Sequence, residues 1–246
     1  MAHRSIIGYV AGSIIVVLTW WGASIASLNL IPGPVMAIFY LGNHLVAAAV
    51  ALSLTLLDAL GGYAVAAAAS ILGLVVCEMG ELGEAVVSTV REVLHSVTPV
   101  AWSLSLLILF GFSSRLVPVL VSALMAFPPL ITSMLEGLRA SRARYGDLSQ
   151  ALRLRGLRRM AYIDLPASVP YFVAGTRSAI GVALISSPVA EAFGTAGGIG
   201  YGLYLFFELH EYSAFEAWSL LLVIVMILLD LVILGPLERW SRRWLE

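Results

Sequence analysis

The chain has 246 residues, of which 60% are hydrophobic and only 12% are charged, whereas about 25% are charged in a typical soluble domain. A soluble globule of this composition would expose apolar patches far larger than monomers tolerate, so we expect a membrane protein. The formal net charge of −1 excludes the basic excess of a nucleic-acid-binding protein, and the high hydrophobicity excludes a disordered chain.

The first two membrane spans are expected in the first third of the chain. A helix needs about 20 mostly apolar residues to cross about 30 Å of hydrocarbon. Residues 6–28 meet this requirement, and their apolar run exceeds the ~7–15 residues of a secretory signal, so we expect an uncleaved span. Residues 44–76 are too long for one crossing and predict an interfacial helix followed by a span from about Leu54. In that span Gly62, Ala66 and Ser70 form a small-residue face suited to close helix packing.

Further apolar stretches complete a prediction of six transmembrane helices in an all-α polytopic membrane protein. The remaining spans are expected at about residues 98–111, 116–138, 165–192 and 215–237. The chain then divides into an N-terminal span with an outer loop (1–43), a transmembrane domain (44–238) and a short tail (239–246).

Arginine positions predict the orientation, because cytoplasmic loops near the membrane collect basic residues. The connection after the fourth span contains Arg139, Arg142, Arg144, Arg153, Arg155, Arg158 and Arg159, and the last span is followed by Arg239, Arg242 and Arg243. We expect the chain in the plasma (inner) membrane of the cell. Both segments and the N-terminus, which carries Arg4, are expected on the cytoplasmic side. The segment 78–92 fits this topology poorly, because it should be cytoplasmic yet carries four Glu and one Arg.

The Arg-rich connection is the segment most informative about function. Asp147 and Gln150 have capping-box spacing and predict the start of a short amphipathic helix. Gly156 supplies a left-handed position to end it, residues 157–163 predict a second short helix, and Pro166 can open the next span. Two short helices of this kind suit the groove of a partner protein or the surface of anionic lipid.

The same connection resembles the coupling loop of type I ABC importer permeases. Gln150-Ala151, then Gly156, then Leu165-Pro166 is similar to the family pattern of Glu-Ala-Ala, Gly and Leu-Pro. Three departures are that Gln150 replaces Glu, that Leu152 replaces the second Ala, and that the spacer before Pro166 is about three residues shorter. Residues 98–102 and 190–201 also resemble the nitrate, sulfonate and taurine branch of that family.

The resemblance implies a subunit that carries out no chemistry of its own. Its coupling loop, 141–164 between spans four and five, would bind cytoplasmic ABC ATPase subunits that use ATP, while this chain binds no cofactor. The other implied partners are a second permease copy, expected as a homodimer, and an extracytoplasmic solute-binding protein. Two alternatives remain open: the transmembrane coupling subunit of a vitamin importer, and a channel or carrier that needs no ATPase.

Ionisable residues inside spans are costly and therefore informative. Arg177 lies eleven residues after Pro166, or about 16 Å along a helix, so near mid-membrane we expect it to pair with Asp230 or Asp58 or to line the solute pathway. Glu191 is expected to reach water at the outer end of span five without a buried partner.

Two further features of the sequence exclude other kinds of site. Gly197, Gly198 and Gly200 predict a tight outer loop, because the segment lacks the Gly-Lys-Ser/Thr ending of a phosphate-binding loop. No catalytic motif and no metal-ligand spacing is present, and Cys77 is the single cysteine.

Overall fold

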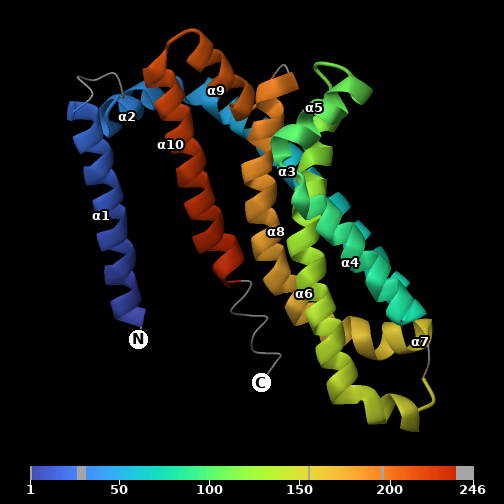
Figure 1. Ribbon diagram of the computed structural model, residues 1–246. Helices are drawn as coiled ribbons and strands as arrows, with labels where there is room; N and C mark the ends of the chain where they lie inside the picture. Colours follow the sequence, from blue (N-terminus) through green and yellow to red (C-terminus); the bar gives the residue numbers. More distant parts are fainter. Residues whose placement is uncertain (1, 27–31, 155, 195–196, 237–246) are drawn as a thin grey trace.

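The computed structural model describes residues 2–26, 32–154, 156–194 and 197–236, and the regular elements in these ranges are helices (Figure 1). In chain order they are α1 (Ala2–Ala26), α2 (Pro34–Asn43), α3 (Leu45–Val76), the 3-10 helix η1 (Cys77–Met79), α4 (Glu81–Ser96), α5 (Pro99–Phe110), α6 (Leu116–Ala151), α7 (Leu157–Arg159), the π-helix η2 (Met160–Asp164), α8 (Leu165–Gly194), α9 (Ile199–Glu208), α10 (Tyr212–Leu229) and the π-helix η3 (Asp230–Leu234). The predicted all-helical architecture is confirmed.

Four of the described helices are long and apolar enough to cross a membrane. They cover Leu45–Met79, Leu116–Ala151, Met160–Gly194 and Tyr212–Val232. A fifth crossing results if α4 and α5, which are bent by 95° relative to each other, count together as one span. The described apolar part of α1, Ile15–Ala26, is shorter. The structure therefore establishes a polytopic arrangement of four or five candidate spans and leaves the predicted number of six as an expectation.

The region 34–76 differs from the prediction of an outer loop and a separate interfacial helix. Pro34 occupies the first turn of α2, a position where its missing N–H costs nothing. The helix α3 then runs without a break over 32 residues, because it contains no proline and its first half is rich in Ala. At 1.5 Å per residue it is about 48 Å long, so it must tilt in, or project from, the hydrocarbon layer.

The predicted third span, 98–111, is instead a bent pair of helices. Val97 and Thr98 have extended backbones, as expected for residues leading into a proline. Thr98 then caps α5, its Oγ1 accepting a 3.4 Å hydrogen bond from the amide of Ala101. The helix α5 has only 12 residues, too few for a crossing, and α4 supplies the rest of the path between the two ends of the molecule (Figure 1).

The core forms where α6 packs against α8 and α3. Its largest buried side chains come mostly from α6, among them Leu130, Ile131 and Met134. The predicted small-residue face of α3 is confirmed, since Gly62, Ala66 and Ser70 are buried. A Cβ at Gly62 would lie 2.5 Å from the Ser122 Cβ and the Val119 carbonyl of α6, so glycine is required for this close approach.

Candidate functional site

The end of α6 differs from the sequence prediction. No helix starts at Asp147, because α6 continues through it to Ala151. Arg153 has a left-handed φ of 52°, and its amide donates to the Gln150 carbonyl at 3.0 Å while the Leu154 amide donates to the Ser149 carbonyl at 3.0 Å. This pair of bonds is a Schellman motif. Arg153 therefore supplies the left-handed position after this helix, three residues before the predicted Gly156.

The second predicted short helix is the first part of a long helix. Residues from Leu157 pass through α7 and the π-helix η2 into α8, and the helix is continuous from Met160 to Gly194. Pro166 therefore lies inside an existing helix and does not open a new one. Gly156 keeps a left-handed φ of 55° just before α7, and α7 returns beside the lower end of α6 (Figure 1).

A buried carboxylate joins the two sides of this connection. Asp164 is 0% exposed and accepts hydrogen bonds from the Ser141 hydroxyl at 2.7 Å and from Arg159 Nε at 3.1 Å. Ser168 donates to the Asp164 carbonyl at 2.7 Å. Because Ser141 lies on α6 and Asp164 ends η2, these bonds fix the distance between the outgoing and returning helices.

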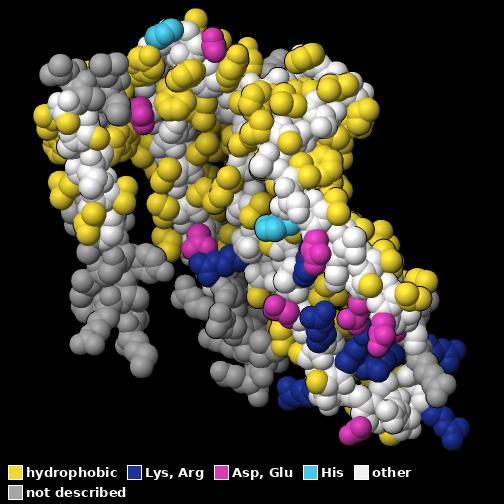
Figure 2. Space-filling model, in the orientation of Figure 1, with side chains coloured by type: hydrophobic (Ala, Val, Ile, Leu, Met, Phe, Trp, Pro, Cys, Tyr) yellow, Lys and Arg dark blue, Asp and Glu magenta, His cyan; other side chains and the backbone are white. Residues whose placement is uncertain are grey.

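The residue next to Ser141 links the same region to the turn between α3 and α4. Arg142 forms an ion pair with Glu84, and its Nη2 donates to the Cys77 carbonyl at 3.2 Å and to Glu78 at 3.5 Å. Arg139 adds a 3.8 Å ion pair with Glu84. The acidic segment that fitted the predicted topology poorly thus lies beside the basic segment, at the same end of the molecule (Figure 2).

The predicted coupling residues are all exposed on the surface of the chain. Six positions at this end of the molecule are exposed: Gln150, Ala151, Leu152, Gly156, Leu165 and Pro166. Arg144, Arg153 and Arg158 are exposed around them. A partner could therefore contact this surface while Asp164 and Arg142 hold it from behind.

The structure brings Arg177 and Asp230 together in a bidentate ion pair. Arg177 Nε and Nη2 each donate to one Asp230 carboxylate oxygen at 2.8 Å. The side chains are 41% and 43% exposed. Arg177 is the central residue of the helix Met160–Gly194, about 26 Å from its end at Gly194. It also lies about 26 Å from the other end at Met160, more than the 16 Å counted from Pro166, because the helix begins before that proline.

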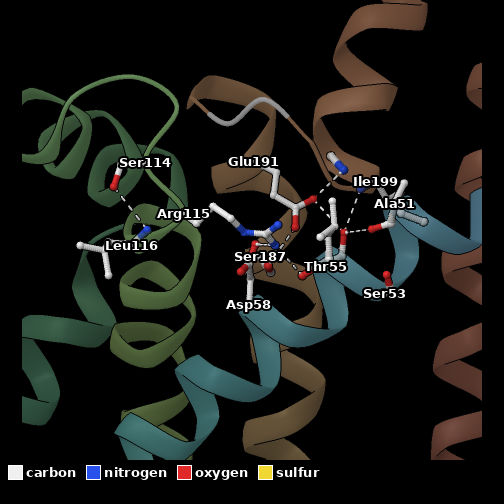
Figure 3. Close-up of polar contacts among 12 residues, drawn as sticks. Ala51, Ser53, Thr55, Asp58, Ser114, Arg115, Leu116, Ser187, Glu191 and Ile199 are labelled. Atoms are coloured by element: carbon white, nitrogen blue, oxygen red, sulfur yellow. Dashed lines mark hydrogen bonds and ion pairs between the residues drawn. The ribbon is translucent and has the colours of Figure 1, made fainter. Parts of the chain in front are cut away.

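Asp58, the other predicted partner of Arg177, instead binds Arg115. Its Oδ2 lies 2.9 Å from Arg115 Nη2, which also donates to the Leu54 carbonyl at 3.1 Å. The Asp58 side chain is 7% exposed and that of Arg115 is 47% exposed. Arg115 precedes α6 and reaches across to α3 in Figure 3, so this pair joins the α5–α6 turn to α3.

Glu191 does not reach water, which corrects the sequence prediction. It is 0% exposed, and its carboxylate accepts hydrogen bonds from the Thr55 hydroxyl at 2.9 Å, the Gly200 amide at 2.8 Å and the Ser187 hydroxyl at 3.3 Å (Figure 3). The segment predicted as a tight outer glycine loop leads into α9 over this carboxylate, because Gly198 is the N-cap of α9 and Gly200 lies in that helix's first turn.

The sequence of this chain matches a known family of transport proteins. The family described as "Binding-protein-dependent transport system inner membrane component" matches residues 69–244, well over half of the chain. The chain belongs to this family. The match begins within α3, so the family comparison leaves α1, α2 and the predicted boundary at residue 43 untested.

Curated relatives of this permease are transport proteins from bacteria. It is 33% identical to a probable ABC transporter permease of Haemophilus influenzae over 37% of this chain and 36% of that protein. It is 30% identical to the nitrate import permease NrtB of Synechococcus elongatus over 58% and 51%, and 28% identical to the putative aliphatic sulfonates permease SsuC of Bacillus subtilis over 45% and 40%. The matches thus span about a third to a half of these relatives.

The fold of the permease also matches a solved structure. The crystal structure of an amino acid ABC transporter with histidines aligns with a TM-score of 0.66, covering 83% of this chain and 97% of that one. The sequence identity is 16%, so this likeness concerns the fold alone.

Sequence reasoning missed several residues that organise the permease. Arg115 had a signal, because it is a lone arginine in a short connection that the arginine pattern places outside. Thr55, Ser141 and Glu84 had none, because their importance depends on partners 23 to 136 residues away. Among the described residues no group of three His, Cys, Asp or Glu side chains is placed to hold a metal ion.

Proposed function

We propose that this permease is the membrane-spanning subunit of an ATP-driven, binding-protein-dependent importer and that residues 141–164 couple it to cytoplasmic ATPase subunits. The observation that carries the proposal is the exposed surface around Ala151 and Gly156, held from behind by Asp164 and Arg142. A surface that is exposed but rigidly supported can transmit a partner's movement to α6 and α8. ATP is bound and hydrolysed by the partner subunits in this proposal.

The solute is a small anion or small organic acid of the nitrate, bicarbonate or sulfonate type. The support is the similarity to NrtB, SsuC and the bicarbonate permease CmpB. The half-exposed Arg177, on a helix that crosses the membrane, is a cation that such solutes could approach. Binding of the solute outside the cell is assigned to the extracytoplasmic binding protein.

In the membrane, two copies of the chain form the core, with both termini and the coupling loop in the cytoplasm. The clustering of exposed arginines at the α7 end supports this orientation. Gln150→Cys should react with a membrane-impermeant maleimide only from the inside, and Leu209→Cys only from the outside. Both positions are exposed, and the native Cys77 is buried. Labelling of Gln150→Cys in intact cells would overturn the orientation.

The deciding experiment is co-purification of the tagged chain with its ATPase. Ala151→Asp and Gly156→Leu should leave membrane insertion intact and strongly reduce the amount of ATPase recovered, because both alter the exposed contact surface. Leu209→Asp is the matched control, since it introduces the same charge at an exposed site next to α9, at the other end. Normal ATPase recovery with both coupling-loop variants would reject the site. Recovery of no nucleotide-hydrolysing partner with the parent chain would favour the ATPase-independent channel or carrier.

A further inference from the structure

The first turn of α9 is held by side chains from two other helices. The first amides of a helix have no acceptor within the helix itself. Here the Ile199 amide donates to Thr55 Oγ1 at 2.8 Å, and the Gly200 amide donates to Glu191 at 2.8 Å. Thr55 comes from α3 and Glu191 from α8, while Gly198 at the N-cap offers no side chain. The cap of α9 is therefore built from tertiary contacts.

The two capping residues are also bonded to each other. The Thr55 hydroxyl donates to Glu191 Oε2 at 2.9 Å, so one chain of bonds runs from the Ile199 amide through Thr55 to the carboxylate. A negative group at a helix N-terminus is further stabilised by the helix dipole. Separation of α3 from α8 would break the bond between Thr55 and Glu191, so the Ile199 and Gly200 amides could no longer both keep their acceptors.

Glycines at the start of α9 allow this helix to pack closely against α8. A side chain at Gly198, whose φ is 95°, would be strained and would collide with the Glu191 carboxylate, and one at Gly200 would collide with the Pro188 carbonyl of α8. Ile199 is 0% exposed and lies in one apolar cluster with Ala51 and Trp218. The helix α9 thus lies against the part of α3 that carries Thr55 (Figure 3).

We propose that Glu191 and Thr55 are positioning residues that latch α9 against the outer part of α3 and the outer end of α8, so that this end of the permease opens only when both amides lose their acceptors. The idea rests on the proposed transport function for its purpose, because an importer must alternately close its two ends. The latch itself is a property of this chain alone. It makes the position of α9 depend on the relation between α3 and α8.

The test uses the full chain in native membranes with a cysteine placed under α9. Ala51→Cys is a small change at a buried position, and we expect slow reaction with a membrane-impermeant maleimide. Adding Glu191→Ala should speed labelling about tenfold, a typical effect of removing a helix cap. Glu191→Gln, which keeps an acceptor oxygen for Gly200, should stay near the parent rate. Thr55→Val should accelerate labelling, and Thr55→Ser should restore the slow rate.

Arg115→Gln is the matched control. Arg115 donates hydrogen bonds to Asp58 and to the Leu54 carbonyl close to the latch, but it does not cap α9. It should leave the labelling of Ala51→Cys unchanged. The latch is rejected if Glu191→Ala and Thr55→Val label at the parent rate, or if Arg115→Gln accelerates labelling equally. If Glu191→Ala does not insert into the membrane, the comparison of Thr55→Val with Thr55→Ser tests the latch by the same criteria.

Failure of the latch and failure of the proposed function give different results. Labelling needs no ATPase and no solute, so a latch that responds to Glu191→Ala stands even if no ATPase co-purifies with the chain. Conversely, the ATPase could co-purify while Glu191→Ala and Thr55→Val leave the labelling rate unchanged. That result would reject the latch and support the transport function. If both hold, Glu191→Ala should retain the ATPase and lower nitrate uptake, which Glu191→Gln should largely preserve.

Discussion

The Ser141 hydroxyl donates a 2.7 Å hydrogen bond to the buried carboxylate of Asp164, joining the two helices that enter and leave the proposed coupling loop. The next residue, Arg142, points to different partners, on η1 and α4. Two adjacent residues of α6 thus connect the loop both to α8 and to the turn after α3. Force applied to the exposed loop would reach three long helices through these contacts.

Removing the Asp164 carboxylate should loosen the loop. Asp164→Ala leaves the buried Ser141 hydroxyl and the partly exposed Arg159 without their acceptor, and a buried unsatisfied group costs about 1–3 kcal/mol. We expect a lower thermal unfolding midpoint of the purified chain and weaker ATPase recovery. Asp147→Ala, at an exposed position of the same connection, is the control. Equal midpoints for the two variants would contradict the anchoring role.

The ion pair between Arg142 and Glu84 should be partly recoverable by exchanging the charges. Glu84→Arg alone places a third arginine beside Arg139 and Arg142 and should destabilise the chain through like-charge repulsion. Adding Arg142→Glu restores an opposite pair, but it cannot restore the bond to the Cys77 carbonyl. The double variant should therefore unfold between the parent and the single variant. A double variant no better than Glu84→Arg would show that the pairing does not stabilise this end.

Two glycines near the loop should respond to the same substitution with opposite signs. Neither Gly146 nor Gly156 has an atom within 4 Å of an added Cβ, so backbone conformation decides the outcome. Gly146 lies inside α6, where alanine is favoured by about 0.5–1 kcal/mol. Gly156 has a φ of 55°, where a side chain costs about 1–2 kcal/mol. Gly146→Ala should raise the unfolding midpoint and Gly156→Ala should lower it, and equal signs would contradict the assigned turn.

Composition and apolar length predict helices and a membrane location, but they do not predict where helices end. The Asp147 and Gln150 pattern is a valid local cap, yet α6 continues because Ser149 is buried at its end and the Schellman bonds form at Arg153. A capping signal of about 1 kcal/mol is easily outweighed by packing.

Long-range pairs are the part of the site that a single sequence does not reveal. The sequence offered two partners for Arg177, and only the packing of α8 with η3 selects Asp230 over Asp58. Glu191 was expected in water because its position along α8 is near the outer end. Its burial depends on α9 folding back, which rests on the bond from the Ile199 amide to Thr55, 144 residues earlier in the chain.

The Arg177–Asp230 pair can be tested for a structural or a solute-facing role by a double-mutant cycle. Arg177→Leu strands a carboxylate in a span, where an unpaired charge costs about 2.5–3.5 kcal/mol on insertion scales. We therefore expect a severalfold loss of assembled protein. Adding Asp230→Leu removes the stranded charge and should recover most of that loss. Ser178→Leu, an exposed neighbour on α8, controls for added bulk.

Nitrate uptake by the same variants separates the two roles, because stability and transport respond differently. If the pair only holds α8 to η3, the double variant should both assemble and take up nitrate. If Arg177 faces the solute, the double variant should assemble but fail in uptake. The half-exposed side chain of Arg177 favours this result. Each side chain of the pair is about two-fifths exposed in the single chain. Equal and independent losses of assembly in the two single variants would exclude an energetic pairing altogether.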